Sequence, residues 1–202
     1  MKKVIIMAFL ISIFPILPAW ANEVKNFYSL ITTPIELIGR AKNLYGTGFF
    51  FYEENRKIMF LVTNYHVLTG FPPEKKSDYV GDRIKIFIHL DEANPGNVQG
   101  KVIPLFTSKK NPIWLTNENF PMADIAVIPL PPDFLKIYKG KALTRPNFKK
   151  DFPVGPNSKV ALIGYPRLFF DKKNFLPIWK IGSIASEPDF DFDGFPQVIV
   201  DV

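Results

Sequence analysis

The sequence predicts an all-β protein, and three observations support this class. The 202-residue chain contains 19 prolines and 12 glycines, which divide it into short segments. Several of these segments are apolar or alternate between apolar and polar residues, as strands do. No segment has the length and period of a long amphipathic helix. Many short strands joined by turns rich in proline and glycine favour a sandwich or a barrel.

The first half of the chain contains the strongest strand patterns. Residues 48–52 and 58–63 are apolar and flank a short polar segment, which predicts a β-hairpin. Residues 83–90 alternate, with Ile84 and Ile86 on the apolar face. Further strands are expected over 98–107 and 124–130, and short helical turns after His66 and near 132–139.

A proline-rich break separates two regions of predicted strands. Residues 22–130 form the expected N-terminal lobe, and residues 131–156 are interpreted as a linker. Residues 157–202 form the second expected region. Strands are predicted there over 159–164, 178–186 and 197–202.

Residues 1–21 have the pattern of a secretory signal peptide. Lys2 and Lys3 precede an almost wholly apolar run over 4–17, and Ala19-Trp20-Ala21 fits a cleavage site. The alternative is a membrane anchor, but the run is shorter than the ~20 residues that span a bilayer and contains proline. We therefore expect an exported protein, periplasmic or secreted, without a membrane segment after cleavage.

The composition excludes several classes of function. The chain has no cysteine and two histidines, which excludes cysteine catalysis and thiolate metal sites and disfavours a histidine-rich zinc site. The formal net charge is +6, but the lysine pairs lie near turn-forming residues and no arginine-rich run is present. Solvated loops explain this charge better than a nucleic-acid partner does.

Two segments contain the residues best suited to take part in catalysis. His66 lies near the end of the segment 61–67, which follows an apolar strand pattern and comes after the glycine-rich residues 46–48. Asp124 begins a second apolar segment, over 123–128. A histidine and a carboxylate so placed suggest the base and the orienting acid of a nucleophilic hydrolase. The alternatives are a buried structural histidine and an aspartate that caps a turn.

These segments resemble the trypsin-like (chymotrypsin-fold) serine peptidases, particularly their cysteine-free bacterial branch. Weaker similarity extends to residues 161–166 and 179–184, in the order expected along the chain. The resemblance implies two β-barrels with the active site between them. The first barrel would be complete and carry His66 and Asp124 as catalytic residues, whereas the second would be only about half present.

The resemblance also implies a serine nucleophile in a Gly-x-Ser-Gly turn, which does not occur in this sequence. Ser158 and Ser183 are the serines nearest in context, but neither lies in such a turn. The chain is therefore interpreted as truncated before the nucleophile and inactive as written. The family implies an exported endopeptidase with a polypeptide substrate and no cofactor or metal. The alternatives are a non-catalytic pseudo-peptidase that binds peptides and a non-functional gene fragment.

Two further residue patterns are interpreted as structural. Asp189, Asp191, Asp193 and Gly194 match the first half of a calcium-binding EF-hand loop, but Val200 occupies the position of its bidentate glutamate. A polar turn is the favoured interpretation. His89 is expected to face solvent, because strand alternation places it with the charged residues of 83–90.

Overall fold

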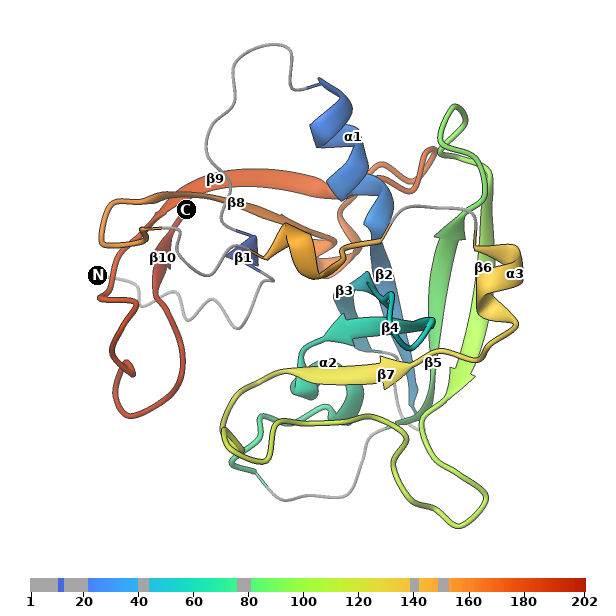
Figure 1. Ribbon diagram of the computed structural model, residues 1–202, viewed down its shortest axis with the longest axis horizontal. Helices are drawn as coiled ribbons and strands as arrows, with labels where there is room; N and C mark the ends of the chain where they lie inside the picture. The colour runs from blue at the N-terminus through green and yellow to red at the C-terminus, as the bar shows by residue number, and fades with distance from the viewer. Residues whose placement is uncertain (1–10, 13–21, 40–43, 76–80, 139–141, 149–152) are drawn as a thin grey trace.

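The structure is a computed structural model, and it is all-β, as the sequence predicts. Its strands form a curled six-stranded sheet and a smaller second sheet (Figure 1), an arrangement consistent with a chymotrypsin-like fold. The described residues are 11–12, 22–39, 44–75, 81–138, 142–148 and 153–202. The expected signal peptide, apart from residues 11–12, therefore lies outside them, as do parts of the expected linker.

The larger sheet has the strand order β6-β5-β2-β3-β4-β7, and every neighbouring pair is antiparallel. It confirms the predicted hairpin and adds a strand, β2, that the sequence pattern did not indicate. The strands are β2 (Thr32–Gly39), β3 (Leu44–Glu53), β4 (Ile58–Thr63), β5 (Gly81–His89), β6 (Val98–Pro104) and β7 (Ala126–Pro129).

The curled sheet is completed by the irregular segment between β6 and β7. The backbone N–H of Ile113 donates to the carbonyl of Leu105 over 2.9 Å, and Leu115 then pairs with Val127 of β7. β6 and β7 themselves are the two edges of the sheet. The first lobe is thus a curled six-stranded half-barrel sheet in which this segment leads from the β6 edge to the β7 edge.

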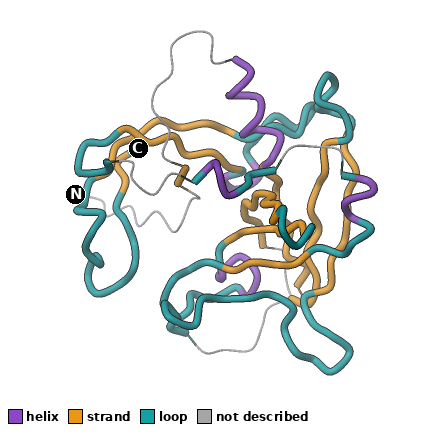
Figure 2. The backbone as a smooth tube through the Cα atoms, in the orientation of Figure 1, coloured by secondary structure: helices purple, strands orange, loops and turns teal. Residues whose placement is uncertain are grey.

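The second sheet has the order β1-β8-β9-β10 and is also antiparallel. Figure 2 shows its strands, in orange, beside the larger sheet. The strand predicted over 197–202 is shorter in the structure, because only Val200 and Asp201 pair with β9. The strands are β1 (Ile11–Ser12), β8 (Lys159–Gly164), β9 (Ile178–Ile184) and β10 (Val200–Asp201).

Helices are few and short. The two predicted helical turns are α2 (Tyr65–Thr69) and α3 (Phe134–Ile137), and the sequence pattern missed α1 (Asn22–Ile31). Short 3-10 turns cover Arg145–Asn147 and Pro166–Leu168. Within the described ranges, none of these helices combines the length and the apolar character needed to span a bilayer.

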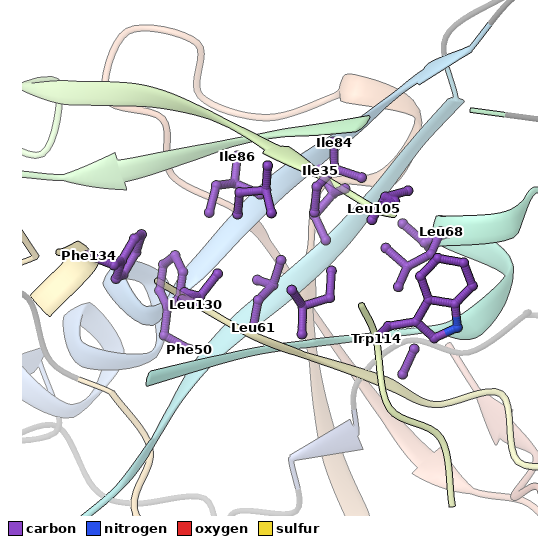
Figure 3. Packing of buried hydrophobic residues seen from close by; sticks show 14 of the residues in the cluster. Ile35, Phe50, Leu61, Leu68, Ile84, Ile86, Leu105, Trp114, Leu130 and Phe134 are labelled. Atoms are coloured by element: carbon purple, nitrogen blue, oxygen red, sulfur yellow. The ribbon is translucent and has the colours of Figure 1, made fainter. Parts of the chain in front are cut away.

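The main hydrophobic core lies inside the curl of the larger sheet. Figure 3 shows side chains from several strands converging there, with Leu61 of β4 near the centre. Leu61 and its cross-strand partner Ile128 are fully buried, and each buried side chain of this kind contributes about 1.5–3 kcal/mol. This packing fixes β4 and β7 relative to each other, and these strands lead into the residues singled out by the sequence.

The two sheets meet along β3 and β8. The backbone N–H of Tyr165, just after β8, donates to Oγ1 of Thr47 on β3 over 2.9 Å. The Tyr165 hydroxyl lies 3.4 Å from the carbonyl of Thr32 on β2 and 2.9 Å from the carbonyl of Phe175 in the loop after β8. Tyr165 is almost fully buried, so it links the sheets through both its backbone and its side chain.

His89 is buried, and the expectation that it faces solvent is wrong. Its ring Nδ1 lies 2.7 Å from the carbonyl of Pro95, and the ring also bonds the carbonyl of Phe175. The Phe87 and Phe175 rings are in contact, with centroids 5.0 Å apart. The loop after β8 therefore covers the outer face of β5, where alternation alone would predict exposure.

Candidate active site

His66 lies in the short helix that follows β4. Asn64 is extended, with φ −82° and ψ 146°, and the chain turns into α2 at Tyr65. Gly70 ends the helix in the left-handed conformation that favours glycine, and its N–H donates to the carbonyl of His66 over 2.8 Å. These two ends confine His66 to a single turn directly after a buried strand.

Two glycines of β3 allow α2 and the core to approach closely. A Cβ added to Gly46 would lie 2.5 Å from both methyl carbons of Val67, which is in α2. A Cβ added to Gly48 would lie 2.7 Å from Ile35 and 2.9 Å from Leu61. The Gly-x-Gly spacing, which the sequence singled out, is thus explained by close packing beneath the helix that carries His66.

The register of β4 and β7 brings Asp124 to His66. Leu61 pairs with Ile128 and Thr63 pairs with Ala126. In an antiparallel pair, the end of one strand lies opposite the start of the other. The residues just after β4 therefore meet the residues just before β7, and Figure 1 shows α2 beside the start of β7.

The Asp124 carboxylate binds His66 through both of its oxygens. Oδ2 lies 2.5 Å from ring Nδ1, and Oδ1 accepts the backbone N–H of His66 over 2.9 Å. An ionised carboxylate only accepts hydrogen bonds, so the neutral imidazole carries its proton on Nδ1. Nε2 then has a lone pair and can act as a base.

The pair is partly accessible. The His66 side chain is 20% exposed and the Asp124 side chain 23% exposed. Burial of this degree strengthens a charge-assisted hydrogen bond relative to one in bulk water, while the ring can still be reached by another molecule. The arrangement is chemically suited to accepting a proton and stabilising the resulting imidazolium.

Asn64 is a site residue for which the sequence offered no prediction. Its side-chain Nδ2 donates to the backbone carbonyl of Asp124 over 2.7 Å. The available signal was a polar residue immediately before a short helix, a position that more often indicates an N-cap. The long-range contact depends on the register of β4 and β7, which the sequence alone does not specify.

The serines considered from the sequence have other partners in the structure. Ser158 Oγ accepts the N–H of Gly155 over 3.0 Å. Ser183 lies within β9, paired with Lys159 on one side and with Asp201 on the other. Neither arrangement is that of a serine activated by His66.

The acidic segment with the EF-hand spacing forms an exposed turn. Asp193 and Gly194 both have positive φ, at 55° and 77°, and Phe192 pairs with Phe195 across them. Within the described part of the chain, no group of three or more metal-ligating side chains is gathered where it could hold an ion. The structure therefore adds no support for a calcium site.

Comparison with known proteins shows similarity to a solved structure. A scan against models of protein families found no match, and neither did a search of curated proteins. Among solved structures, the chain is similar to a thermostable serine protease, AL20, from an extremophilic microorganism. The two are 11% identical, with a TM-score of 0.46, and the match covers 81% of this chain and 70% of the other.

Proposed function

We propose that this chain carries the base and the acid of an exported serine endopeptidase. The observation that supports this most directly is the two-oxygen contact of the Asp124 carboxylate with His66. That contact fixes the tautomer of the imidazole and the orientation of its ring, which are two of the tasks of the acid in a Ser-His-Asp triad. The substrate in this proposal is a polypeptide, and no cofactor takes part.

The proposed reaction proceeds by acyl transfer. His66 Nε2 takes the proton of a serine hydroxyl as its oxygen attacks the peptide carbonyl carbon. His66 then gives that proton to the amine as the C–N bond breaks, and Asp124 stabilises the imidazolium while it exists. Water hydrolyses the acyl-serine, again with His66 as the base.

In this proposal, the serine comes from a Gly-x-Ser-Gly turn that follows Val202 in a longer reading frame. The signal peptide predicted over residues 1–21 belongs to the same proposal and would direct the chain to the periplasm or the exterior.

The test is casein cleavage by the product of the reading frame continued past codon 202. Asp124→Asn keeps the shape of the side chain but favours the wrong imidazole tautomer, so kcat should fall about 10⁴-fold, as for acid-to-amide changes in such triads. His66→Ala should lower kcat to a similar extent. Initial rates over a range of casein concentrations would separate kcat from KM.

Thr33→Val is a suitable control, because Thr33 is fully buried on β2 and its hydroxyl bonds the backbone of Phe87. It should change stability but leave kcat within a few-fold of the unsubstituted enzyme. A continued frame with no Gly-x-Ser-Gly turn would contradict the proposal. So would an Asp124→Asn variant that cleaves casein at the full rate.

A further inference from the structure

Asn64 occupies a helix N-cap without doing what an N-cap side chain does. An asparagine at this position ordinarily accepts a backbone N–H of the first helical turn through its side-chain oxygen. Here the side chain makes no capping hydrogen bond. The N–H groups of the first turn have other partners: the backbone carbonyl of Asn64 accepts that of Val67 over 3.1 Å, and Asp124 Oδ1 accepts that of His66 over 2.9 Å. The side chain is left for another role.

That side chain is used across the sheet, toward Asp124. Asn64 is only 8% exposed, and its Nδ2 donates to the Asp124 carbonyl over 2.7 Å. A buried side-chain amide held by a hydrogen bond of this length has a defined orientation. The contact joins residues that are 60 positions apart in the sequence.

Asp124 needs such an anchor because it precedes the β-ladder. The pairing of β4 with β7 begins only at Ala126. Before it, the N–H of Ile125 donates to the carbonyl of Ala123 over 2.8 Å, which forms a three-residue turn centred on Asp124. A residue in such a turn lacks the ladder bonds that fix its neighbours in the strand.

We infer that Asn64 is a positioning residue that holds the backbone of Asp124 so that its carboxylate meets the His66 ring. With this contact, three hydrogen bonds join Asp124 to residues 64–66. One is to its carbonyl and two are to its carboxylate. The backbone and the side chain of the acid are therefore both fixed relative to the imidazole. This role rests on the proposed peptidase function, but the geometry can be tested without turnover.

The readout is the Nδ1 proton of His66 in the NMR spectrum of the 202-residue chain. A proton shared with a carboxylate at 2.5 Å should resonate far downfield and exchange slowly with water. In Asn64→Ala and Asn64→Leu, which remove the donor, this signal should move upfield or be lost to exchange. Asn64→Leu also retains most of the side-chain volume, which separates the lost bond from a cavity.

The matched control is Thr33→Val, which removes a different buried hydrogen-bonding side chain of the same lobe. It should lower the melting temperature while leaving the His66 proton signal in place. If both Asn64 variants fold and keep the signal where the unsubstituted chain has it, the inference is overturned. A loss of the signal in Thr33→Val as well would also overturn it, because the signal would then report only general stability.

A second measurement uses the unsubstituted chain and does not depend on whether a variant folds. One Nδ2 proton of Asn64 should exchange with water more slowly than those of exposed Asn117. Equal exchange rates would contradict the hydrogen bond to Asp124. Neither measurement requires peptide cleavage, so a failure of the proposed function and a failure of this inference give different results.

Discussion

Gly46 shows how one missing side chain can control the position of another. Its backbone lies against Val67, which directly follows His66 in α2. The distance of 2.5 Å from the added Cβ to each Val67 methyl carbon is shorter than any tolerated contact. A side chain at residue 46 must therefore displace the helix turn that carries the proposed base.

We predict that Gly46→Ala lowers the free energy of unfolding by about 1–3 kcal/mol, the usual cost of overpacking a buried contact. Urea denaturation would measure it. Val67→Ala removes the two methyl groups that cause the clash, so the double variant should be more stable than the sum of the single changes implies. Strictly additive losses would show that the strain does not arise from this contact.

Single residues also show what the sequence alone could and could not predict. Local pattern drew attention to His66 and Asp124, because each adjoins a short apolar strand, and the structure brings these two side chains into contact. It failed for His89, because the loop that covers this residue comes from the second sheet, far along the chain. It also failed for the contact of Asn64. Burial by distant segments and contacts with them depend on tertiary packing. The pattern of apolar and polar residues within one segment does not reveal them.

At the scale of elements, β2 is the strand that the sequence pattern concealed. Pro34 lies within it, and a proline ordinarily argues against a central strand. The structure accommodates Pro34 because the β2–β5 ladder runs only from Glu36 to Gly39. Beside Pro34, the hydroxyl of Thr33 accepts the N–H of Phe87 and donates to its carbonyl, each over 2.9 Å. A side chain thus replaces the missing ladder bonds.

Because β2 lies between β3 and β5, its apolar side chains should contribute strongly to stability. Leu37 is fully buried, and we predict that Leu37→Ala lowers the free energy of unfolding by about 2–5 kcal/mol. The control is Val102→Ala on the edge strand β6, where the side chain is 54% exposed. This control substitution should lower the free energy of unfolding by less than about 0.5 kcal/mol. Similar chemical denaturation midpoints for the two variants would contradict the burial of β2.

At the scale of the whole molecule, the contacts that join the two sheets include the buried imidazole of His89. The loop after β8 reaches the first lobe, where the carbonyl of Phe175 bonds both His89 and Tyr165. His89 also bonds the carbonyl of Pro95. The protonation of this buried imidazole is therefore coupled to the seam between the sheets.

Burial lowers the pKa of His89 below its ordinary value of 6.5, although the carbonyls of Pro95 and Phe175 partly oppose the shift. The unfolded chain then binds more protons than the folded chain in the interval between the two values. The contribution of His89 to stability is therefore fully present above about pH 6.5. It is lost progressively as the pH falls toward the folded-state value.

We predict that the free energy of unfolding falls between pH 7 and pH 5 more steeply in the unsubstituted chain than in His89→Asn. Asparagine can place its side-chain nitrogen near the Nδ1 position and donate to Pro95, but it does not titrate. The carboxylates are common to both proteins, so their contribution cancels in the difference between the two pH profiles. Urea unfolding at half-unit pH steps would measure it. Parallel profiles would mean that His89 is protonated as readily in the folded chain as in the unfolded chain. The contacts of His89 between the sheets would then not contribute to the pH dependence of stability.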